Sequence, residues 1–219
     1  MEFRAHRLDN FDTINALFNQ ETEGSLSDRG RDEARAVARH FSGKRLDAIY
    51  ASPLLRAKET ADATAEVLGM DVAVREEITE LRTGRLPEGS AAQRILSGIS
   101  GSPLPKPVKR VMLGGSLIPL YFQSWRSGRT EGGESPADLE ARITRMFEEL
   151  QAAHGEDAHV ALFAHGYLIF YLSSIWAQRS LNTLRPFVQP YIPNGSITTM
   201  EVSAHPRPRL IEYAAARHL

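Results

Sequence analysis

Apolar and polar residues along the chain follow the periods of helices and strands in turn. One helical stripe consists of four residues spaced three and four apart: Ala34, Val37, Ala38 and Phe41. The apolar run 46–51 predicts a strand, residues 54–68 lack Gly and Pro and predict a helix, and residues 71–75 predict a second strand. This alternation of helix and strand predicts an α/β fold with a mainly parallel sheet.

The same alternation returns in the second half of the chain. A helix is expected from Ser135-Pro136-Ala137-Asp138 to just before Gly155, because a serine N-cap, a proline at N1 and an acid at N3 all favour a helix start. Residues 159–164 are continuously apolar, which predicts a buried strand, and a helix over 167–178 follows. Two further strands that pair with one another are expected at residues 196–202 and 210–213.

The middle of the chain is irregular. Residues 91–133 contain three prolines between positions 100 and 107 and several glycines, which favours an inserted lid with some helix over a separate domain. The lid brings basic side chains, Lys106, Lys109, Arg110, Arg126 and Arg129, and aromatic ones, Tyr121, Phe122 and Trp125. These residues fit either a solvated face or a surface that accepts an apolar or ring part of a substrate.

Composition narrows the class of protein. The chain has 219 residues, which suits a single domain, and its 26 Lys and Arg nearly balance its 27 Asp and Glu, so no basic field favours nucleic acid. The absence of cysteine excludes disulfides and thiol nucleophiles. The first residues lack the apolar segment of a secretory signal, and His165-Gly166 interrupts the one long apolar stretch. A cytoplasmic enzyme or binding protein without a membrane span is expected, and a homo-oligomer stays open.

An anion site is predicted where the strand at 46–51 passes into a helix. Ser52 is expected as the N-cap and Pro53 at N1, and unpaired backbone N–H groups at such a helix start attract anions. Arg56 falls in the first turn, where the helix dipole disfavours a cation. A bound anion would account for the arginine, and a solvated side chain or a surface ion pair is the alternative.

A second polar residue follows the strand at 159–164. A lone histidine at a strand end is usually structural, but Gly166 directly after His165 allows a ligand to approach the backbone closely. The carboxyl ends of parallel strands meet at one edge of a sheet, where ligands bind. We therefore expect Arg56 and His165 to lie at the same edge.

Three stretches resemble the histidine phosphatase superfamily, the phosphoglycerate-mutase-like proteins. The sequence Ser-Pro-Leu-x-Arg-Ala-x-x-Thr-Ala at 52–61 resembles the second phosphate-binding motif of that family, and Ala164-His165-Gly166 before an apolar helix resembles its second histidine motif. Glu80 with Gly84 four residues later, followed by Glu88-Gly89, resembles the loop that carries the proton-donor glutamate of the family. The resemblance implies one histidine-phosphatase-like domain over 1–219, a three-layer α/β/α sandwich with 91–133 as a lid.

The resemblance also implies a reaction. It predicts a metal-independent phosphomonoester phosphatase that needs no cofactor and acts on a phosphorylated metabolite. A histidine attacks phosphorus, water hydrolyses the resulting phosphohistidine, and a nearby acid donates and accepts the proton. Glu80 is implied as that acid, with Glu77 as the alternative, and the implied phosphate-binding residues are Arg4, Arg56 and His165.

The N-terminal motif departs from the family pattern. The family begins with a buried strand followed by Arg-His-Gly, whereas here Phe3 is the only large apolar residue before Arg4, and Ala5 separates Arg4 from His6. Of the seven histidines only His6 lies near the expected motif, so the resemblance assigns phosphorylation to His6. Two alternatives stay open: a phosphoglycerate-type mutase, and a member that binds a phosphorylated ligand or a protein partner without turnover.

Overall fold

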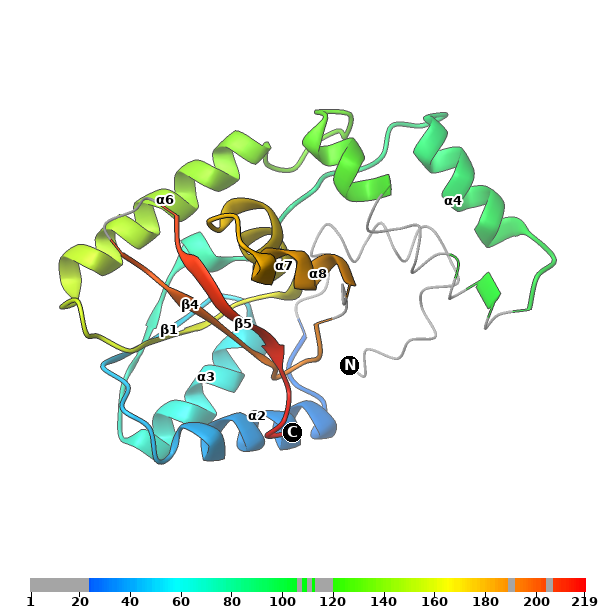
Figure 1. Cartoon of the computed structure of the whole chain (residues 1–219). Helices are drawn as coiled ribbons and strands as arrows, with labels where there is room; N and C mark the ends of the chain where they lie inside the picture. The colour runs from blue at the N-terminus through cyan, green and yellow to red at the C-terminus, as the bar shows by residue number, and fades with distance from the viewer. Residues whose placement is uncertain (1–23, 106–107, 110–111, 113–119, 189–191, 204–206) are drawn as a thin grey trace. The chain divides into compact units, whose positions relative to one another are not determined.

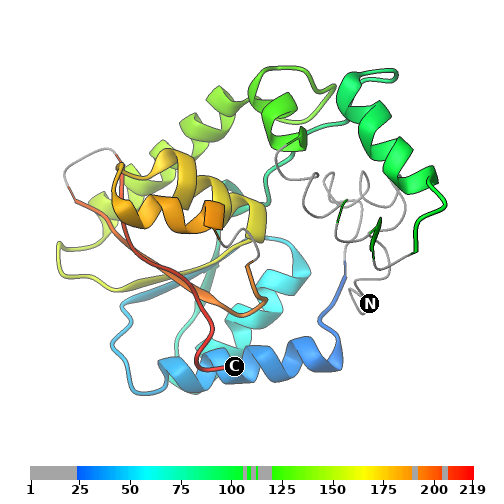
Figure 2. The ribbon, with the colours of Figure 1, turned by 45° about the vertical axis from the view of Figure 1, so that its right-hand side comes forward.

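The structure is a computed structural model and describes residues 24–105, 108–109, 112, 120–188, 192–203 and 207–219. The chain forms two compact units, shown in two views in Figures 1 and 2. The described residues 24–80 and 140–219 belong to the first unit, and those from 81 to 139 belong to the second. Arg4 and His6 lie outside the described residues.

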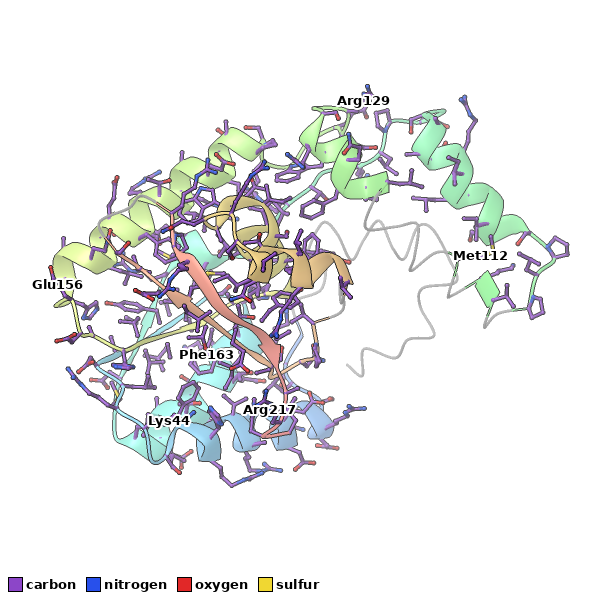
Figure 3. The ribbon with its side chains drawn as sticks, viewed as in Figure 1. Lys44, Met112, Arg129, Glu156, Phe163 and Arg217 are labelled. Atoms are coloured by element: carbon purple, nitrogen blue, oxygen red, sulfur yellow. The ribbon has the colours of Figure 1, made fainter. Side chains whose placement is uncertain are left out.

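A parallel sheet forms the centre of the first unit. Its three strands, β1 (Ala48–Ala51), β2 (Val72–Val74) and β3 (Val160–Phe163), run in the order β2-β1-β3 with both pairs parallel. The predicted α/β class with a parallel sheet is thereby confirmed. Ala51 is in register with Val74 on one side and with Phe163, labelled in Figure 3, on the other. The three strands therefore end together, and the segments that follow them start at one edge.

Helices cover the sheet of the first unit on both faces. In Figures 1 and 2, α2 (Asp28–Phe41) and α3 (Leu55–Leu68) lie on one side, and α7 (Gly166–Tyr171) lies on the other. Ala61 and Ala65 of α3 pack with Ile49 and Ala51 of β1 in one buried cluster. These small side chains allow the helix to approach the strand closely, which fixes where its first turn meets the sheet edge.

The start of α3 differs from the prediction. Leu54, not Ser52, is its N-cap, so the expectation that Ser52 caps the helix directly was wrong. The physical reason is that the backbone of Ser52, one residue after β1, is still bonded to β3: its N–H donates to the carbonyl of Phe163 at 3.0 Å. Arg56 remains in the first turn, and Gly69 ends the helix in the left-handed conformation with φ of 64°.

Two further helices bear on the site. α6 (Pro136–Ala153) begins as predicted, and the Ser135 hydroxyl accepts from the backbone N–H of Asp138 at 3.1 Å. The single helix expected over 167–178 is instead α7 followed by a π-helical turn, Leu172–Trp176. The hydroxyls of Ser173 and Ser174 donate to carbonyls four residues earlier, which is typical of a bent or widened helix.

The carboxyl-terminal strands pair with one another as expected. β4 (Ile197–Glu201) and β5 (Arg209–Ala215) form a separate antiparallel two-stranded sheet. Between α7 and these strands lie two short turns of helix, Leu181–Leu184 and α8 (Arg185–Val188). Among the described residues no helix has the length and apolar character needed to cross a membrane.

The second unit contains α4 (Ala91–Gly101) and a helical stretch at residues 120–126. Gly84 with φ of 74° and Gly133 with φ of 80° lie where backbones approach closely. A Cβ at Gly84 would lie 2.2 Å from the carbonyl oxygen of Gly132, and one at Gly133 would lie 2.5 Å from that of Arg82. Both positions therefore require glycine, so the glycine of the Glu-x-x-x-Gly motif has a structural reason of its own.

The aromatic residues of the expected lid are buried. Tyr121, Phe122 and Trp125 are all less than a tenth exposed. The Tyr121 hydroxyl donates to the carbonyl of Gly84 at 3.1 Å, and the Trp125 indole N–H donates to that of Glu134 at 2.6 Å. The idea that these rings accept a substrate was wrong. The rings are packed in the interior of the unit, and the polar atoms of Tyr121 and Trp125 are hydrogen-bonded to backbone carbonyls there. The role of residues 91–133 as a lid stays a prediction.

Candidate functional site

The candidate site lies at the carboxyl edge of the parallel sheet, within the first unit. Ser52 follows β1, and Arg56 lies in the first turn of the helix after it. Glu80 follows β2 after the 3₁₀ turn Glu76–Ile78, and His165 comes two residues after β3. Because the three strands end in register, polar side chains from segments far apart in sequence meet here.

His165 is held by a serine at the end of the neighbouring strand. Its Nε2 atom lies 2.8 Å from the hydroxyl oxygen of Ser52, and both residues are buried, with 6% and 0% of their surfaces exposed. The same hydroxyl oxygen accepts from the backbone N–H of Leu54 at 3.3 Å. Sequence reasoning missed this pair, because the serine fitted a helix cap well enough to need no other role.

The surroundings of His165 favour its neutral form. Burial, and to a smaller extent the positive charges of Arg56 and Arg142, together lower the pKa of its imidazole to about 3. The ring is therefore uncharged at neutral pH. A neutral imidazole carries one hydrogen on one of its two nitrogens, so it can donate at one and accept at the other.

Arg56 is half-buried in the first turn of α3. Burial lowers the pKa of its guanidinium, and the negative charge of Glu80 acts in the opposite direction. Guanidinium groups keep their charge throughout the physiological range, so Arg56 contributes a fixed positive charge to this edge of the sheet. The predicted closeness of Arg56 to His165 agrees with the effect of its charge on the imidazole.

Glu80 is fastened to the turn that begins with His165. Its two carboxylate oxygens accept from the backbone N–H groups of Leu168 at 2.9 Å and Tyr167 at 3.3 Å. These amides belong to the first turn of α7, whose N-cap, His165, makes no side-chain capping bond. Glu80 is buried, with 9% of its surface exposed, and supplies the cap from another segment. Its carboxylate is thereby fixed beside His165 and close enough to Arg56 to affect its pKa.

Arg142 of α6 is a further residue that sequence reasoning missed. Its guanidinium donates to the carbonyl of Glu77 and, at 3.1 Å, to that of Thr79. It thus holds the loop just before Glu80, and its charge acts on His165. The sequence did contain one indication that Arg142 is partly buried. It lies three residues after Leu139 and one before Ile143, at the border of an apolar helix face.

Replacing Arg142 by alanine is expected to destabilise the protein by about 1–3 kcal/mol, because two carbonyls in the loop before Glu80 lose their donors. Urea unfolding followed by circular dichroism measures this difference. Arg145→Ala is the matched control, since Arg145 is an exposed arginine on the same helix. Equal stability of the two variants would show that the loop does not depend on Arg142.

The predicted site residues divide into two groups. Arg56, Glu80 and His165 come together in the first unit, whereas Arg4 and His6 lie outside the described residues. Glu77, the alternative acid, contributes its backbone carbonyl to Arg142. Within the described ranges no three His, Asp or Glu side chains gather in a way that could hold a metal ion. Independence from metals stays a prediction for experiment.

Comparison with known families shows the family of the chain. The sequence matches the histidine phosphatase superfamily (branch 1) over residues 12–97 and 117–214. The chain belongs to the histidine phosphatase superfamily. The matched ranges include Arg56, Glu80 and His165, and they begin after Arg4 and His6.

Individual members of the superfamily are moderately similar to the chain. A putative phosphoserine phosphatase 2 of Hydrogenobacter thermophilus is 28% identical over 153 residues, covering 68% of the chain and 65% of that protein. Phosphoserine phosphatase 1 of the same organism is 30% identical over 133 residues, covering 59% of the chain and 54% of that protein. The match therefore spans less than two thirds of the length of either relative.

A solved structure of the superfamily is similar over more of its length. The mycobacterial glucosyl-3-phosphoglycerate phosphatase has a TM-score of 0.63 and 25% identity, covering 88% of this chain and 87% of its own. A complex of that protein with inorganic phosphate has a TM-score of 0.60 and 26% identity, covering 89% of both chains.

Proposed function

We propose that the protein is a metal-independent phosphomonoester phosphatase that works through a phosphohistidine on His6. The observation that carries this proposal is the meeting of Arg56, Glu80 and His165 at one sheet edge in the first unit. The guanidinium supplies a fixed positive charge, the imidazole supplies a hydrogen-bond donor, and the carboxyl group carries a proton. Those are the parts that phosphoryl transfer needs in a site without a metal.

Each proposed residue has one role. Arg4, Arg56 and His165 bind the phosphate oxygens, whose charge spreads over three equatorial positions in the transition state. With Glu80 in its protonated form, a ring nitrogen of His6 attacks phosphorus while the bond to the ester oxygen breaks, and the Glu80 carboxyl gives that oxygen its proton. Glu80 then takes a proton from water as the water oxygen attacks phosphorus and the bond to His6 breaks. Inorganic phosphate leaves, and both side chains return to their starting states.

The proposed substrates are small phosphorylated metabolites. The similar proteins are named for phosphoserine and for glucosyl-3-phosphoglycerate, both phosphate monoesters of small carboxylic acids. A substrate carboxylate would need a cation beyond those that hold the phosphate.

The test measures phosphate release from p-nitrophenyl phosphate and from phosphoserine by the full chain, with and without EDTA. Turnover that EDTA leaves unchanged is expected. Alkaline quenching during turnover, followed by mass spectrometry, should find an acid-labile phosphate on His6. A His6→Ala variant should be inactive and should trap no phosphate.

Four other results would contradict or change the proposal. Activity abolished by EDTA and restored by a divalent ion would refute the metal-independent mechanism. Phosphate trapped on His165 would exchange the roles of the two histidines. Tight binding of phosphoserine without turnover would favour the non-catalytic alternative, and transfer of phosphate within a phosphoglycerate would favour a mutase.

A further inference from the structure

The Ser52 hydroxyl is fully buried, so its one hydrogen and two lone pairs depend on hydrogen-bond partners within the protein. The structure gives this oxygen two partners among the described residues: the backbone N–H of Leu54 at 3.3 Å and Nε2 of His165 at 2.8 Å. The Leu54 N–H is a donor only, so it takes a lone pair. The direction of the second hydrogen bond decides what becomes of the serine hydrogen.

Two arrangements of the pair are conceivable. If Nε2 carried the imidazole hydrogen, it would donate to Ser52, and the oxygen would then accept two hydrogen bonds. The serine hydrogen would have no acceptor in the described part of the chain, at a place that water does not reach. If Nε2 is unprotonated, the serine hydroxyl donates to it, and every hydrogen-bonding group of the pair is satisfied.

The second arrangement fixes the rest of the ring. His165 is neutral at physiological pH, since burial and two nearby arginines lower the pKa of its imidazole. Its single hydrogen must then lie on Nδ1. None of the hydrogen bonds found among the described residues involves Nδ1, so this N–H is the polar group that His165 has to offer a ligand.

We propose that Ser52 is a positioning residue that holds His165 as the Nδ1–H tautomer, so that the ring presents an N–H donor to a phosphate oxygen. Phosphate oxygens are acceptors, and an unprotonated nitrogen facing them would repel them. The opposite tautomer would turn a lone pair toward the ligand. The role in phosphate binding rests on the proposed function, whereas the tautomer itself does not.

The tautomer is measurable without any turnover. Protonated and unprotonated ring nitrogens of histidine have well-separated 15N chemical shifts, and couplings to the ring carbon-bound hydrogens tell Nδ1 from Nε2. We expect 15N-histidine-labelled full-length protein at pH 7 to show His165 with protonated Nδ1 and unprotonated Nε2, with the signal assigned by its loss in His165→Gln. A protonated Nε2, alone or together with Nδ1, would overturn the proposal.

Variants separate positioning from general stability. Ser52→Ala should remove the preference for the Nδ1–H tautomer and lower kcat/KM by about 10–100-fold, the range found for partners that orient imidazoles in metal sites. Ser52→Thr keeps a hydroxyl and should keep the tautomer. Ser27→Ala is the matched control, because it removes a serine oxygen that accepts a backbone N–H at 3.1 Å but contacts no histidine. An unchanged His165 spectrum in folded Ser52→Ala would contradict the role of Ser52.

Titration with inorganic phosphate separates this inference from the proposed function. A shift of the Nδ1 resonance on phosphate addition, absent in Ser52→Ala, is expected. An Nδ1–H tautomer in the wild-type protein with no response to phosphate and no turnover would leave the tautomer established and refute the proposed function. A response to phosphate by a protein whose His165 is the Nε2–H tautomer would support phosphate binding at the site and refute the proposed tautomer.

Discussion

Replacing Arg56 by alanine is expected to lower kcat on a phosphate monoester by about 10²–10³-fold, or roughly 2.7–4 kcal/mol of barrier. Arg56 is a half-buried cation at the sheet edge, and its charge reaches both Glu80 and His165. Such a preorganised charge stabilises the equatorial oxygens of a transferring phosphoryl group more strongly than water does. Steady-state kinetics on p-nitrophenyl phosphate measures the loss.

The matched control for this variant is Lys58→Ala, which removes an exposed cation two residues further along α3. It is expected to retain wild-type kinetics. A second readout does not depend on turnover. Since the charge of Arg56 contributes to the low pKa of His165, its removal should raise that pKa, while burial, the larger cause, still holds it below the ordinary value. Activity of Arg56→Ala within a few-fold of the wild type would contradict the proposed role in phosphate binding.

The parts of the site that depend on local sequence were predictable. A strand that passes directly into a helix is visible in the residues around Ser52 and around His165, because apolar runs and helix-start residues act over short distances. The parallel sheet then follows from the alternation of elements, and with it the closeness of Arg56 and His165. The exact first residue of α3 did not follow, because a backbone bond from Ser52 to Phe163 outweighs its tendency to cap.

The contacts between distant segments were not predictable. Ser52 and His165 are 113 residues apart, and Arg142 is 63 residues from Thr79, whose carbonyl it binds. No local pattern encodes such a partner, because the tertiary fold alone brings the two side chains together. The aromatic residues of the 91–133 segment illustrate the same point: their composition suggested a ligand surface, and burial of Tyr121 and Trp125 excludes it.

Glu80 combines two roles that one substitution can separate. Its carboxylate accepts from the backbone N–H groups of Tyr167 and Leu168, and it is also the proposed proton donor. In Glu80→Gln the amide oxygen can still accept from one N–H, but the amide nitrogen is itself a donor and cannot accept from the other. A loss of about 1 kcal/mol in stability is therefore expected whether or not Glu80 transfers a proton.

The catalytic role predicts an additional dependence on the leaving group. Glu80→Gln cannot protonate an ester oxygen, so turnover of phosphoserine, whose alkoxide is a poor leaving group, should fall by about 10²–10⁴-fold. Turnover of p-nitrophenyl phosphate should fall far less, because its leaving group departs without a proton.

The matched control is Glu76→Gln, because Glu76 is an exposed glutamate in the same segment. This variant should leave both rates unchanged. Equal slowing of both esters in Glu80→Gln would show that Glu80 only caps α7 and does not donate a proton. The same leaving-group dependence in Glu77→Gln instead would transfer the proton-donor role to Glu77.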